Sequence, residues 1–378
     1  MERDSPNWWR EVGMSRTLAD RGMDLALRLA ARGEGSTYPN PCVGATVVHR
    51  DQIVSSARTR PTGQCHAEVR ALKRAGSGAH GAVLFVTLEP CSHVGRTPPC
   101  TAAIIEAGIQ TVVIGVRDPA SHASGRGLSE LRRAGLRVID GFRSVEAARV
   151  HAHYLHHVAT GLPWVTLKVA SSLDGQIACA DGDSKWITSE AARRNAHRER
   201  ARHHAVAVGA ATVRCDDPRL DVRHVRGVDP RPIAFDSRLR LSSSASWRFL
   251  RSGALILHTA AASRAAVLRT KKLNAQLVEV DADTRGRVSV AGALEALGTL
   301  EIRSVLVEGG GEMLASFVRE KHWQRWLVYQ APRLLGQGRP MLPGLAWTRV
   351  VDAPQVRLIS RRKLGDDLLW ILAPKGAA

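Results

Sequence analysis

The chain is poor in cysteine, in lysine and in long apolar runs. Six cysteines in 378 residues are too few for a disulfide framework and suit reduced thiols in the cytosol. No run of 18 or more apolar residues occurs, so we expect no membrane span and no membrane partner. The stretch from Met1 to Thr17 is charged and has no apolar segment, which excludes a secretory signal. These absences predict a cytoplasmic protein.

Aromatic residues of the kind that stack on bases are also scarce, although the net charge is +19. Such a charge suggests nucleic-acid binding. However, only eight of the 54 basic residues are lysine, and the arginine excess fits a GC-rich genome. The basic residues are spread along the chain without a tail or interleaved aromatics. We therefore expect anionic small ligands, no specific nucleic-acid partner, and a homo-oligomer.

Length and periodicity indicate two α/β domains. A chain of 378 residues with 44% hydrophobic residues can bury two cores. We predict an N-terminal extension over 1–14, a first domain over 15–146, a connecting helix over 147–162 and a second domain over 163–378. Residues 1–13, which precede the first helical pattern, are expected to be disordered or to reflect the choice of start site. Strands and helices alternate in the first half, which favours a largely buried sheet.

One split motif stands out in the first half. His66-Ala67-Glu68 opens a predicted helix, Cys91 follows the apolar strand 82–88, and Cys100 lies in the first turn of a helix over 99–107. One histidine and two cysteines can hold zinc with a fourth position open for water, which is typical of a catalytic site. Glu68 is placed to move protons without being a ligand. This is the signature of the zinc deaminases, and helix N-termini favour the thiolates.

Four histidines gather in a predicted connecting helix, at positions 151, 153, 156 and 157. They suggest a second metal site. Because no cysteine or carboxylate lies among them, we favour a solvated, partly interdomain helix.

The second half contains a glycine-rich turn between the strand 304–307 and a helix over 312–319, Glu308-Gly309-Gly310-Gly311. Such a turn lets a phosphate approach the helix N-terminus, although a tight turn alone also needs glycine. The spacing differs from Gly-x-Gly-x-x-Gly, so no Rossmann fold is predicted. A long basic helix over 189–202 is expected to be mostly solvated.

Both halves resemble one family, the bifunctional riboflavin-biosynthesis deaminase/reductases, over about residues 15–375. The first half carries these motifs: Pro39-Asn40-Pro41, His66-Ala67-Glu68, Glu89-Pro90-Cys91-Ser92-His93 and Gly95-Arg96-Thr97-Pro98-Pro99-Cys100. The eight-residue gap between the cysteines argues against the cytidine and tRNA adenosine deaminases, which use Pro-Cys-x-x-Cys. The second half carries Lys168, Trp186-Ile187-Thr188-Ser189, Asp216-Asp217-Pro218 and Val307-Glu308-Gly309-Gly310.

The resemblance implies a cytidine-deaminase-like αβα domain followed by a dihydrofolate-reductase-like α/β domain. It implies zinc-dependent deamination of a phosphorylated pyrimidine, then NADPH-dependent reduction of its ribosyl group to ribityl. The implied zinc ligands are His66, Cys91 and Cys100, with Glu68 and Lys168 catalytic. The implied cofactor contacts are Ala170, Trp186, Thr212, Asp216, Gly310 and Gly311. The implied substrate contacts are Asn40, His93, Arg96, Ser184, Arg200, Leu220, Arg223 and Glu308, with Arg200 and Arg223 as phosphate partners.

Three departures from the family pattern lie in the first half. A histidine seven residues before His66 is replaced by Thr59, an asparagine by Cys42, and an Asp-Pro-Asn-Pro loop by Asp118-Pro119-Ala120-Ser121. Either arginines such as Arg58 or Arg60 have taken over phosphate binding, or the deaminase half is retuned or inactive in a paralogue that serves a secondary pathway. A nucleic-acid-binding or editing protein is a third alternative, against which the cysteine spacing argues.

Overall fold

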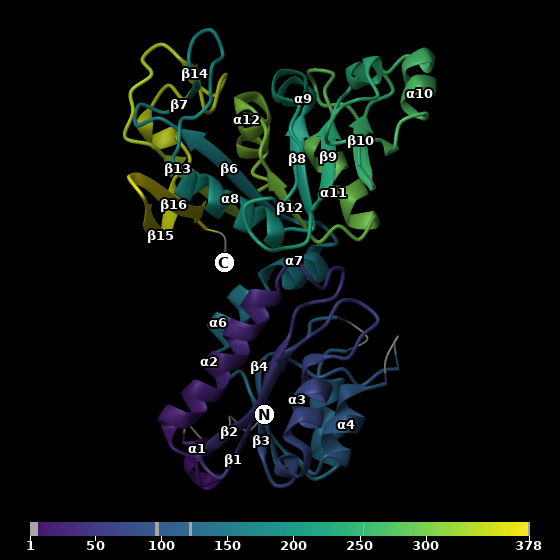
Figure 1. Ribbon diagram of the computed structural model, residues 1–378, viewed down its shortest axis with the longest axis vertical. Helices are drawn as coiled ribbons and strands as arrows, with labels where there is room; N and C mark the ends of the chain where they lie inside the picture. Colours follow the sequence, from purple (N-terminus) through teal and green to yellow (C-terminus); the bar gives the residue numbers. More distant parts are fainter. Residues whose placement is uncertain (1–6, 95–97, 121–122, 252, 377–378) are drawn as a thin grey trace. The chain divides into compact units, whose positions relative to one another are not determined.

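The computed structural model describes residues 7–94, 98–120, 123–251 and 253–376. The chain divides into two compact units, Met1–Thr160 and Gly161–Ala378. Each unit has its own sheet (Figure 1), with buried core residues on both faces. Among the described residues, no helix is both long enough and apolar enough to cross a membrane.

The N-terminal unit is built on a five-stranded sheet in the order β2-β1-β3-β4-β5. Strand β1 pairs antiparallel with β2 and β3, and the remaining pairs are parallel. The elements are α1 Trp8–Glu11, α2 Arg16–Gly33, β1 Gly44–His49, β2 Gln52–Arg58, α3 Ala67–Ala75, η1 Gly76–Ala79, β3 Val83–Leu88, α4 Cys100–Glu106, β4 Thr111–Val116, α5 Arg126–Arg133, β5 Arg137–Asp140, α6 Ser144–Val150 and α7 Ala152–Thr160.

Helices cover both faces of this sheet, and β3 is accordingly buried at every position. Leu84 and Val86 point into a core formed with α3, α4 and α5, while Val83 and Phe85 point into a second core formed with α1, α2 and α6. Figure 1 shows α2 and α6 along one face and α3 and α4 along the other. The three layers give the αβα arrangement expected from the sequence.

The prediction of disorder before the first helix is wrong for residues 7–13. The Trp8 side chain is buried and meets the Phe142 ring edge-on at 5.4 Å between centroids. The guanidinium of Arg16 lies 4.6 Å from the centroid of the Trp9 ring. Aromatic burial therefore anchors this segment to the α2–α6 face of the sheet.

The histidine-rich segment is also different from its prediction. It forms two helices, α6 and α7, and two of its four histidines are buried rather than solvated. His151 Nε2 lies 2.9 Å from Thr87 Oγ1, and burial lowers the pKa of His151 to about 4. His153 Nδ1 lies 2.9 Å from the Tyr38 hydroxyl and 3.2 Å from a Glu34 carboxylate oxygen. Both histidines serve packing and hydrogen bonding within the N-terminal unit.

The C-terminal unit is built on a nine-stranded sheet in the order β11-β10-β9-β8-β12-β6-β13-β16-β15, beside a small β14-β7 ribbon. The sheet is parallel from β11 to β13 and antiparallel from β13 to β15. The elements are β6 Trp164–Ser171, β7 Gln176–Ala178, α8 Glu190–Arg202, β8 Ala205–Gly209, α9 Ala210–Asp216, β9 Arg231–Phe235, η2 Arg240–Ser243, β10 Ala254–His258, α10 Arg264–Thr270, β11 Ala275–Glu279, α11 Val290–Thr299, β12 Ser304–Val307, α12 Gly311–Arg319, β13 Arg325–Gln330, β14 Arg339–Pro340, η3 Val350–Asp352, β15 Val356–Leu364 and β16 Asp367–Pro374.

The buried strands again supply a core on each face. Residues of α8, α9 and α10 pack on one face, and residues of α11 and α12 pack on the other. The carboxyl ends of the parallel strands meet at one edge, where α/β sheets bind their ligands. That edge carries the glycine-rich turn between β12 and α12.

Candidate active sites

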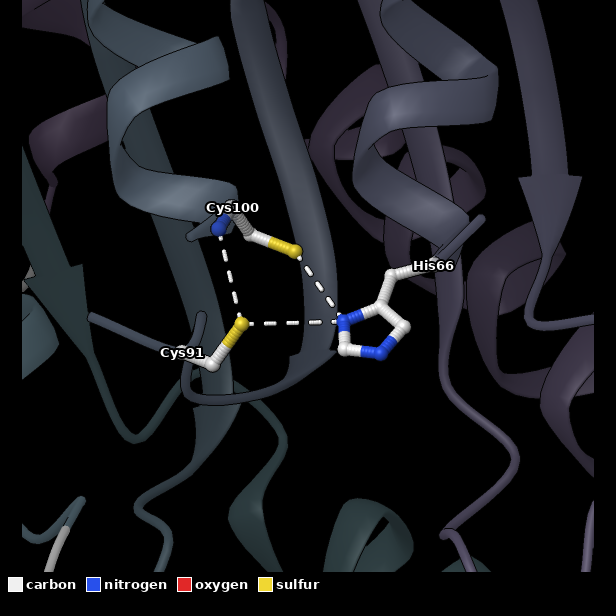
Figure 2. A group of neighbouring side chains, drawn as sticks. All are labelled: His66, Cys91 and Cys100. Carbon is white, nitrogen blue, oxygen red and sulfur yellow. Dashed lines mark hydrogen bonds between the residues drawn. The ribbon is translucent and has the colours of Figure 1, made fainter. Parts of the chain in front are cut away.

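The N-terminal unit brings His66, Cys91 and Cys100 together (Figure 2). His66 is the N-cap residue of α3, Cys100 is the first residue of α4, and Cys91 follows β3. His66 Nδ1 lies 3.2 Å from Cys100 Sγ and 3.6 Å from Cys91 Sγ. The three ligand atoms all lie within 4.8 Å of one another.

This donor set fits zinc. Zinc binds thiolate sulfur at about 2.3 Å and imidazole nitrogen at about 2.0–2.1 Å, so tetrahedral ligands lie about 3.5 Å apart. The observed separations match that spacing. The thiol of Cys100 and the imidazole of His66 hydrogen-bond to Cys91 and lower the pKa of its thiol to about 4. The neighbouring Cys91 and burial raise the pKa of Cys100. A cation is therefore needed before both sulfurs can be thiolates together.

Glu68 lies beside the three ligands in the first turn of α3. Its side chain is only 3% exposed, and its Oε2 atom has no hydrogen-bond partner among the described residues. Burial raises the pKa of Glu68, against the opposing effect of His66. An unpaired carboxylate oxygen in such a place is costly unless a ligand meets it. Its position beside the ligands and its unpartnered oxygen fit the role of proton carrier, which stays a prediction.

The predicted substrate contacts of this half lie in loops. Asn40 is half-buried in the loop after α2, where its carbonyl accepts a hydrogen bond from Thr37 Oγ1 at 2.9 Å. His93 is exposed in the segment between Cys91 and α4. Arg96 lies outside the described residues. Their substrate roles stay predictions.

The substituted position Thr59 has a structural use. Its side chain is buried, and its Oγ1 accepts a hydrogen bond from Val43 N at 3.1 Å. Arg58 Nη1 donates to the carbonyl of Arg32 at 2.6 Å, at the end of α2. Arg60 is exposed. Of the two arginines considered as replacements for the missing histidine, Arg60 is therefore the more available to a phosphate.

A cavity of about 1550 Å³ opens at the carboxyl edge of the C-terminal sheet. All twelve residues predicted for the reductase half line it: Lys168, Ala170, Ser184, Trp186, Arg200, Thr212, Asp216, Leu220, Arg223, Glu308, Gly310 and Gly311. They come from β6, α8, α9, α12 and the loops between. The fold brings these scattered positions to one place.

Glu308 is the centre of a charged group in this cavity. Arg200 donates to it through two nitrogens, Nε to Oε1 at 2.6 Å and Nη2 to Oε2 at 2.8 Å. Lys168 Nζ lies 3.9 Å from Oε2. Burial alone would raise the pKa of Glu308, but Arg200 and Lys168 outweigh it and hold the pKa at about 2. Burial lowers the pKa of Lys168, which Glu308 opposes. Glu308 is therefore an anion that favours the charged form of Lys168.

The two predicted phosphate partners differ in their surroundings. The Arg200 side chain is 13% exposed, and its Nη1 also donates to the carbonyl of Asp221 at 3.1 Å. The Arg223 side chain is 43% exposed and meets the Asp221 carboxylate at 2.6 Å. Arg200 thus mainly holds Glu308, whereas Arg223 keeps donors facing the cavity. The phosphate role of each stays a prediction.

The glycine-rich turn fits a dinucleotide phosphate. Gly310 is the N-cap residue of α12. A Cβ atom on Gly311 would lie 2.6 Å from Pro343 Cδ and 2.8 Å from the carbonyl of Pro340. Glycine at 311 is therefore required by packing against the Pro340–Pro343 segment. A Cβ atom on Gly310 would have only Thr212 Oγ1 nearby, at 3.6 Å, so the helix N-terminus stays open to a ligand on that side. Nearby, Trp186 is 58% exposed and stacks against the Arg193 guanidinium at 4.6 Å.

Several cavity residues were not identified from the sequence. They include five arginines that follow β9 or β11 in the chain, Arg238, Arg240, Arg248, Arg285 and Arg287. No local motif marks them, because in the sequence they are five among 54 basic residues. Only the parallel strand order places them around one opening.

Comparison with known proteins agrees with both sites. Residues 16–116 match the model of the cytidine and deoxycytidylate deaminase zinc-binding region, and residues 163–370 match that of the RibD C-terminal domain. The riboflavin biosynthesis protein RibD of Bacillus amyloliquefaciens is 39% identical over 93% of this chain and 95% of that protein. The structure of Acinetobacter baumannii RibD matches with a TM-score of 0.85 and 34% identity, covering 95% of this chain and 99% of that one. A deaminase/reductase from Thermotoga maritima matches with a TM-score of 0.83, 33% identity and the same coverage.

Fold and sites together define a two-domain enzyme, a zinc-dependent deaminase joined to a reductase. The chain belongs to the RibD family of riboflavin biosynthesis proteins. Membership confirms the predicted resemblance, the two α/β domain folds, the bifunctional chemistry and the zinc and NADPH cofactors. Nothing in these comparisons favours a secondary-pathway paralogue or a nucleic-acid-binding protein. The roles of individual residues, the domain boundaries and the oligomeric state stay predictions.

Proposed function

We propose that this chain catalyses two consecutive steps of riboflavin biosynthesis at two separate sites. The first is hydrolytic deamination of 2,5-diamino-6-ribosylamino-4(3H)-pyrimidinone 5′-phosphate. The second is NADPH-dependent reduction of the ribosyl group of the deaminated product. One observation carries the proposal: a single chain holds a buried glutamate beside a His-Cys-Cys set and a separate cavity lined by all predicted reductase residues.

In the first step, His66, Cys91 and Cys100 would hold the zinc ion, which would lower the pKa of the water that replaces the amine on the ring carbon. Glu68 takes the proton that this water loses, through the Oε2 atom that has no protein partner. It then delivers the proton to the leaving nitrogen, which departs as ammonia. The buried position of Glu68 keeps bulk water from this proton transfer.

In the second step, the ribosylamine opens and hydride is added to C1′. Opening breaks the C1′–O4′ bond, and O4′ needs a proton. Lys168 is the buried proton donor that faces the cavity, and Glu308 stabilises its charged form. Arg200 fixes the orientation of Glu308 through two hydrogen bonds. Arg223 binds the 5′-phosphate at the more open side of the cavity.

The proposal extends to the setting of the enzyme. A cytoplasmic location, a homo-oligomeric state and the absence of a specific nucleic-acid partner complete it. The location rests on the cysteine content, and the absence of a nucleic-acid partner rests on the spread of basic residues and the small-molecule character of the sites.

The direct test supplies the purified, zinc-loaded protein with the aminopyrimidine and NADPH, and follows ammonia and NADPH oxidation separately. We expect one ammonia released and one NADPH oxidised per substrate, with ammonia release first. Ammonia release without NADPH oxidation would contradict the reductase assignment. NADPH oxidation of pre-deaminated substrate without any ammonia from the aminopyrimidine would show a deaminase half with another substrate.

A further inference from the structure

The loop that carries Arg223 packs directly against α8. It spans residues 217–230, between the end of α9 and the start of β9. A Cβ atom on Gly227 would lie 2.5 Å from the Cβ atom of Ala201 on α8, so the loop and the helix approach as closely as a glycine allows. Because the packing is this close, side chains on α8 decide where the loop lies, and with it Arg223.

His197 is the side chain of α8 that meets the loop at Arg223. It is only 5% exposed, and its Nδ1 accepts a hydrogen bond from the amide of Arg223 at 3.5 Å. The ring of His224, the next residue in the loop, meets the His197 ring edge-on at 4.6 Å between centroids. Both contacts fall on adjacent residues of the loop. His197 therefore fixes the backbone at the point where the Arg223 side chain leaves it.

The His197 imidazole is neutral in the folded protein, as the contact with an amide requires. Burial, followed by the charges of Arg200 and Arg223, lowers the pKa of His197 to about 4. His224 acts in the same direction, and Glu308 opposes them. A neutral imidazole carries one proton, and the amide of Arg223 meets Nδ1, which assigns that proton to Nε2. Nδ1 therefore keeps its lone pair for the amide near neutral pH.

The Arg223 side chain is held at its other end as well. Its Nη1 donates to Asp221 Oδ1 at 2.6 Å, while the side chain remains 43% exposed and lines the cavity. An arginine that is held at both its amide and its guanidinium loses less conformational freedom when an anion binds than a free one does. The orientation of Arg223 thus depends on a residue that does not itself line the cavity.

From these contacts, and resting on the proposed function, we propose that His197 is a positioning residue of the reductase. By accepting the hydrogen bond from the amide of Arg223, it holds this arginine toward the 5′-phosphate of the substrate. It thereby makes the enzyme prefer phosphorylated over dephosphorylated substrates. His197 acts through Arg223 and takes no part in the transfer of hydride or of the proton.

The test is a double-mutant cycle in the full-length protein, with pre-deaminated substrate and saturating NADPH. His197→Leu fills the space but cannot accept the amide hydrogen, whereas His197→Gln carries an oxygen that can. Each is made alone and together with Arg223→Ala, and kcat and KM are measured for phosphorylated and dephosphorylated substrates. His203→Leu is the matched control, because His203 is a buried histidine at the end of α8 whose ring nitrogens lie against Glu199 and Thr166.

We expect His197→Leu to raise KM for the phosphorylated substrate about 3- to 10-fold, as the loss of one hydrogen bond predicts. The kcat and the KM for the dephosphorylated substrate should stay within about twofold of wild type. His197→Gln should restore the KM for the phosphorylated substrate. In the Arg223→Ala background, His197→Leu should have no further effect. His203→Leu should lower the unfolding temperature without changing the ratio of the two KM values.

An equal rise in KM for both substrates, or an effect of His197→Leu that adds to that of Arg223→Ala, would overturn the positioning role. An unchanged KM in His197→Leu would overturn it too. In these cases, discrimination that is lost in Arg223→Ala alone would leave the proposed function standing. If Arg223→Ala affected both substrates alike, the phosphate contact of the proposed function would itself be wrong, and the inference would fall with it.

Discussion

The two units of this chain solve the problem of building an active site differently. The deaminase site needs four side chains from three short segments, all next to helix starts or a strand end. The reductase site collects residues from β6, α8, α9, α12 and several loops around one cavity. A metal requires few ligands at close range, so its site is compact. A dinucleotide and a phosphorylated sugar are long, so their site draws on the edge of a whole sheet.

The two sites also differ in the interactions that hold their residues in place. In the N-terminal unit, thiols and an imidazole need a cation to complete them. In the C-terminal unit, Glu308, Arg200 and Lys168 complete one another before any ligand enters. The reductase site is therefore preorganised by its own charges, and the deaminase site by its metal.

Removal of the metal should separate the two halves most strongly. Because zinc completes only the N-terminal site, chelation should reduce ammonia release to the uncatalysed background. NADPH oxidation on pre-deaminated substrate should stay within about twofold, since no zinc ligand lies in the reductase cavity. Metal content by atomic absorption accompanies both assays, with about one zinc per chain expected before chelation. If both activities fell together while the protein remained folded, the two sites would not be separate.

Glu68→Gln should have the next largest effect. The amide cannot carry the proton, and general acid–base catalysis contributes about 10²–10⁴-fold. Deamination should fall by that factor, with zinc content and thermal unfolding close to wild type, because Oε2 has no protein partner to lose. Glu106→Gln, in α4 of the same unit, serves as a control. Deamination that persists at wild-type rate would remove Glu68 from the mechanism.

The two arginines of the reductase site should respond differently. Arg223→Ala should raise KM for the phosphorylated substrate about tenfold and leave KM for the dephosphorylated substrate unchanged. Arg200→Lys keeps the charge but loses the paired hydrogen bonds to Glu308. It should lower kcat for both substrates alike. If Arg200→Lys discriminated between the two substrates as Arg223→Ala does, Arg200 would be a phosphate partner.

The smallest effect concerns acid stability of the C-terminal unit. The pKa of Glu308 is held at about 2, below its ordinary value of 4.5. The stability that its ionised form contributes is therefore complete above pH 4.5 and is lost as pH falls through 2, with an upper limit of about 3 kcal/mol.

Thermal unfolding of wild type and Glu308→Gln should therefore differ most at pH 6, and the gap should narrow from pH 5 to pH 3. Glu190→Gln removes an exposed carboxylate that pairs with Arg194 and serves as the control. A gap that stays constant over this range would mean that Glu308 is not an anion in the folded protein.

The sequence predicts local features of both halves well. The predicted strand over 304–307 agrees with β12, and His66 lies at the N-cap of α3, where the sequence predicts the start of a helix. Each has either an apolar run bounded by turns or a clear start signal. Strands β13, β15 and β16 were not predicted. Exposed arginines interrupt β15, and pairing with distant strands decides its structure.

Residue environments are harder to predict than elements. From the sequence, His151 is a polar residue on a solvated helix. In the structure it is buried, and its Nε2 lies 2.9 Å from the Thr87 hydroxyl on β3. Arg200 looks like one of several arginines on a basic helix, yet Glu308, 108 residues later, binds it twice. Arg238 and Arg240 carry no motif, and only the strand order brings them to the cavity. In each case the decisive neighbour is far away in the sequence.

The central claim is that one chain holds two independent sites that act in succession. Mixing two variants tests it most directly: Glu68→Gln, and Lys168→Ala, in which Arg200 still pairs with Glu308. Supplied with the aminopyrimidine and NADPH, Glu68→Gln alone should release little ammonia, and Lys168→Ala alone should release ammonia but oxidise little NADPH. The mixture should complete both steps. At the end of the reaction, the amount of ammonia released should equal the amount of NADPH oxidised. A mixture that oxidises no more NADPH than either variant alone would contradict the account.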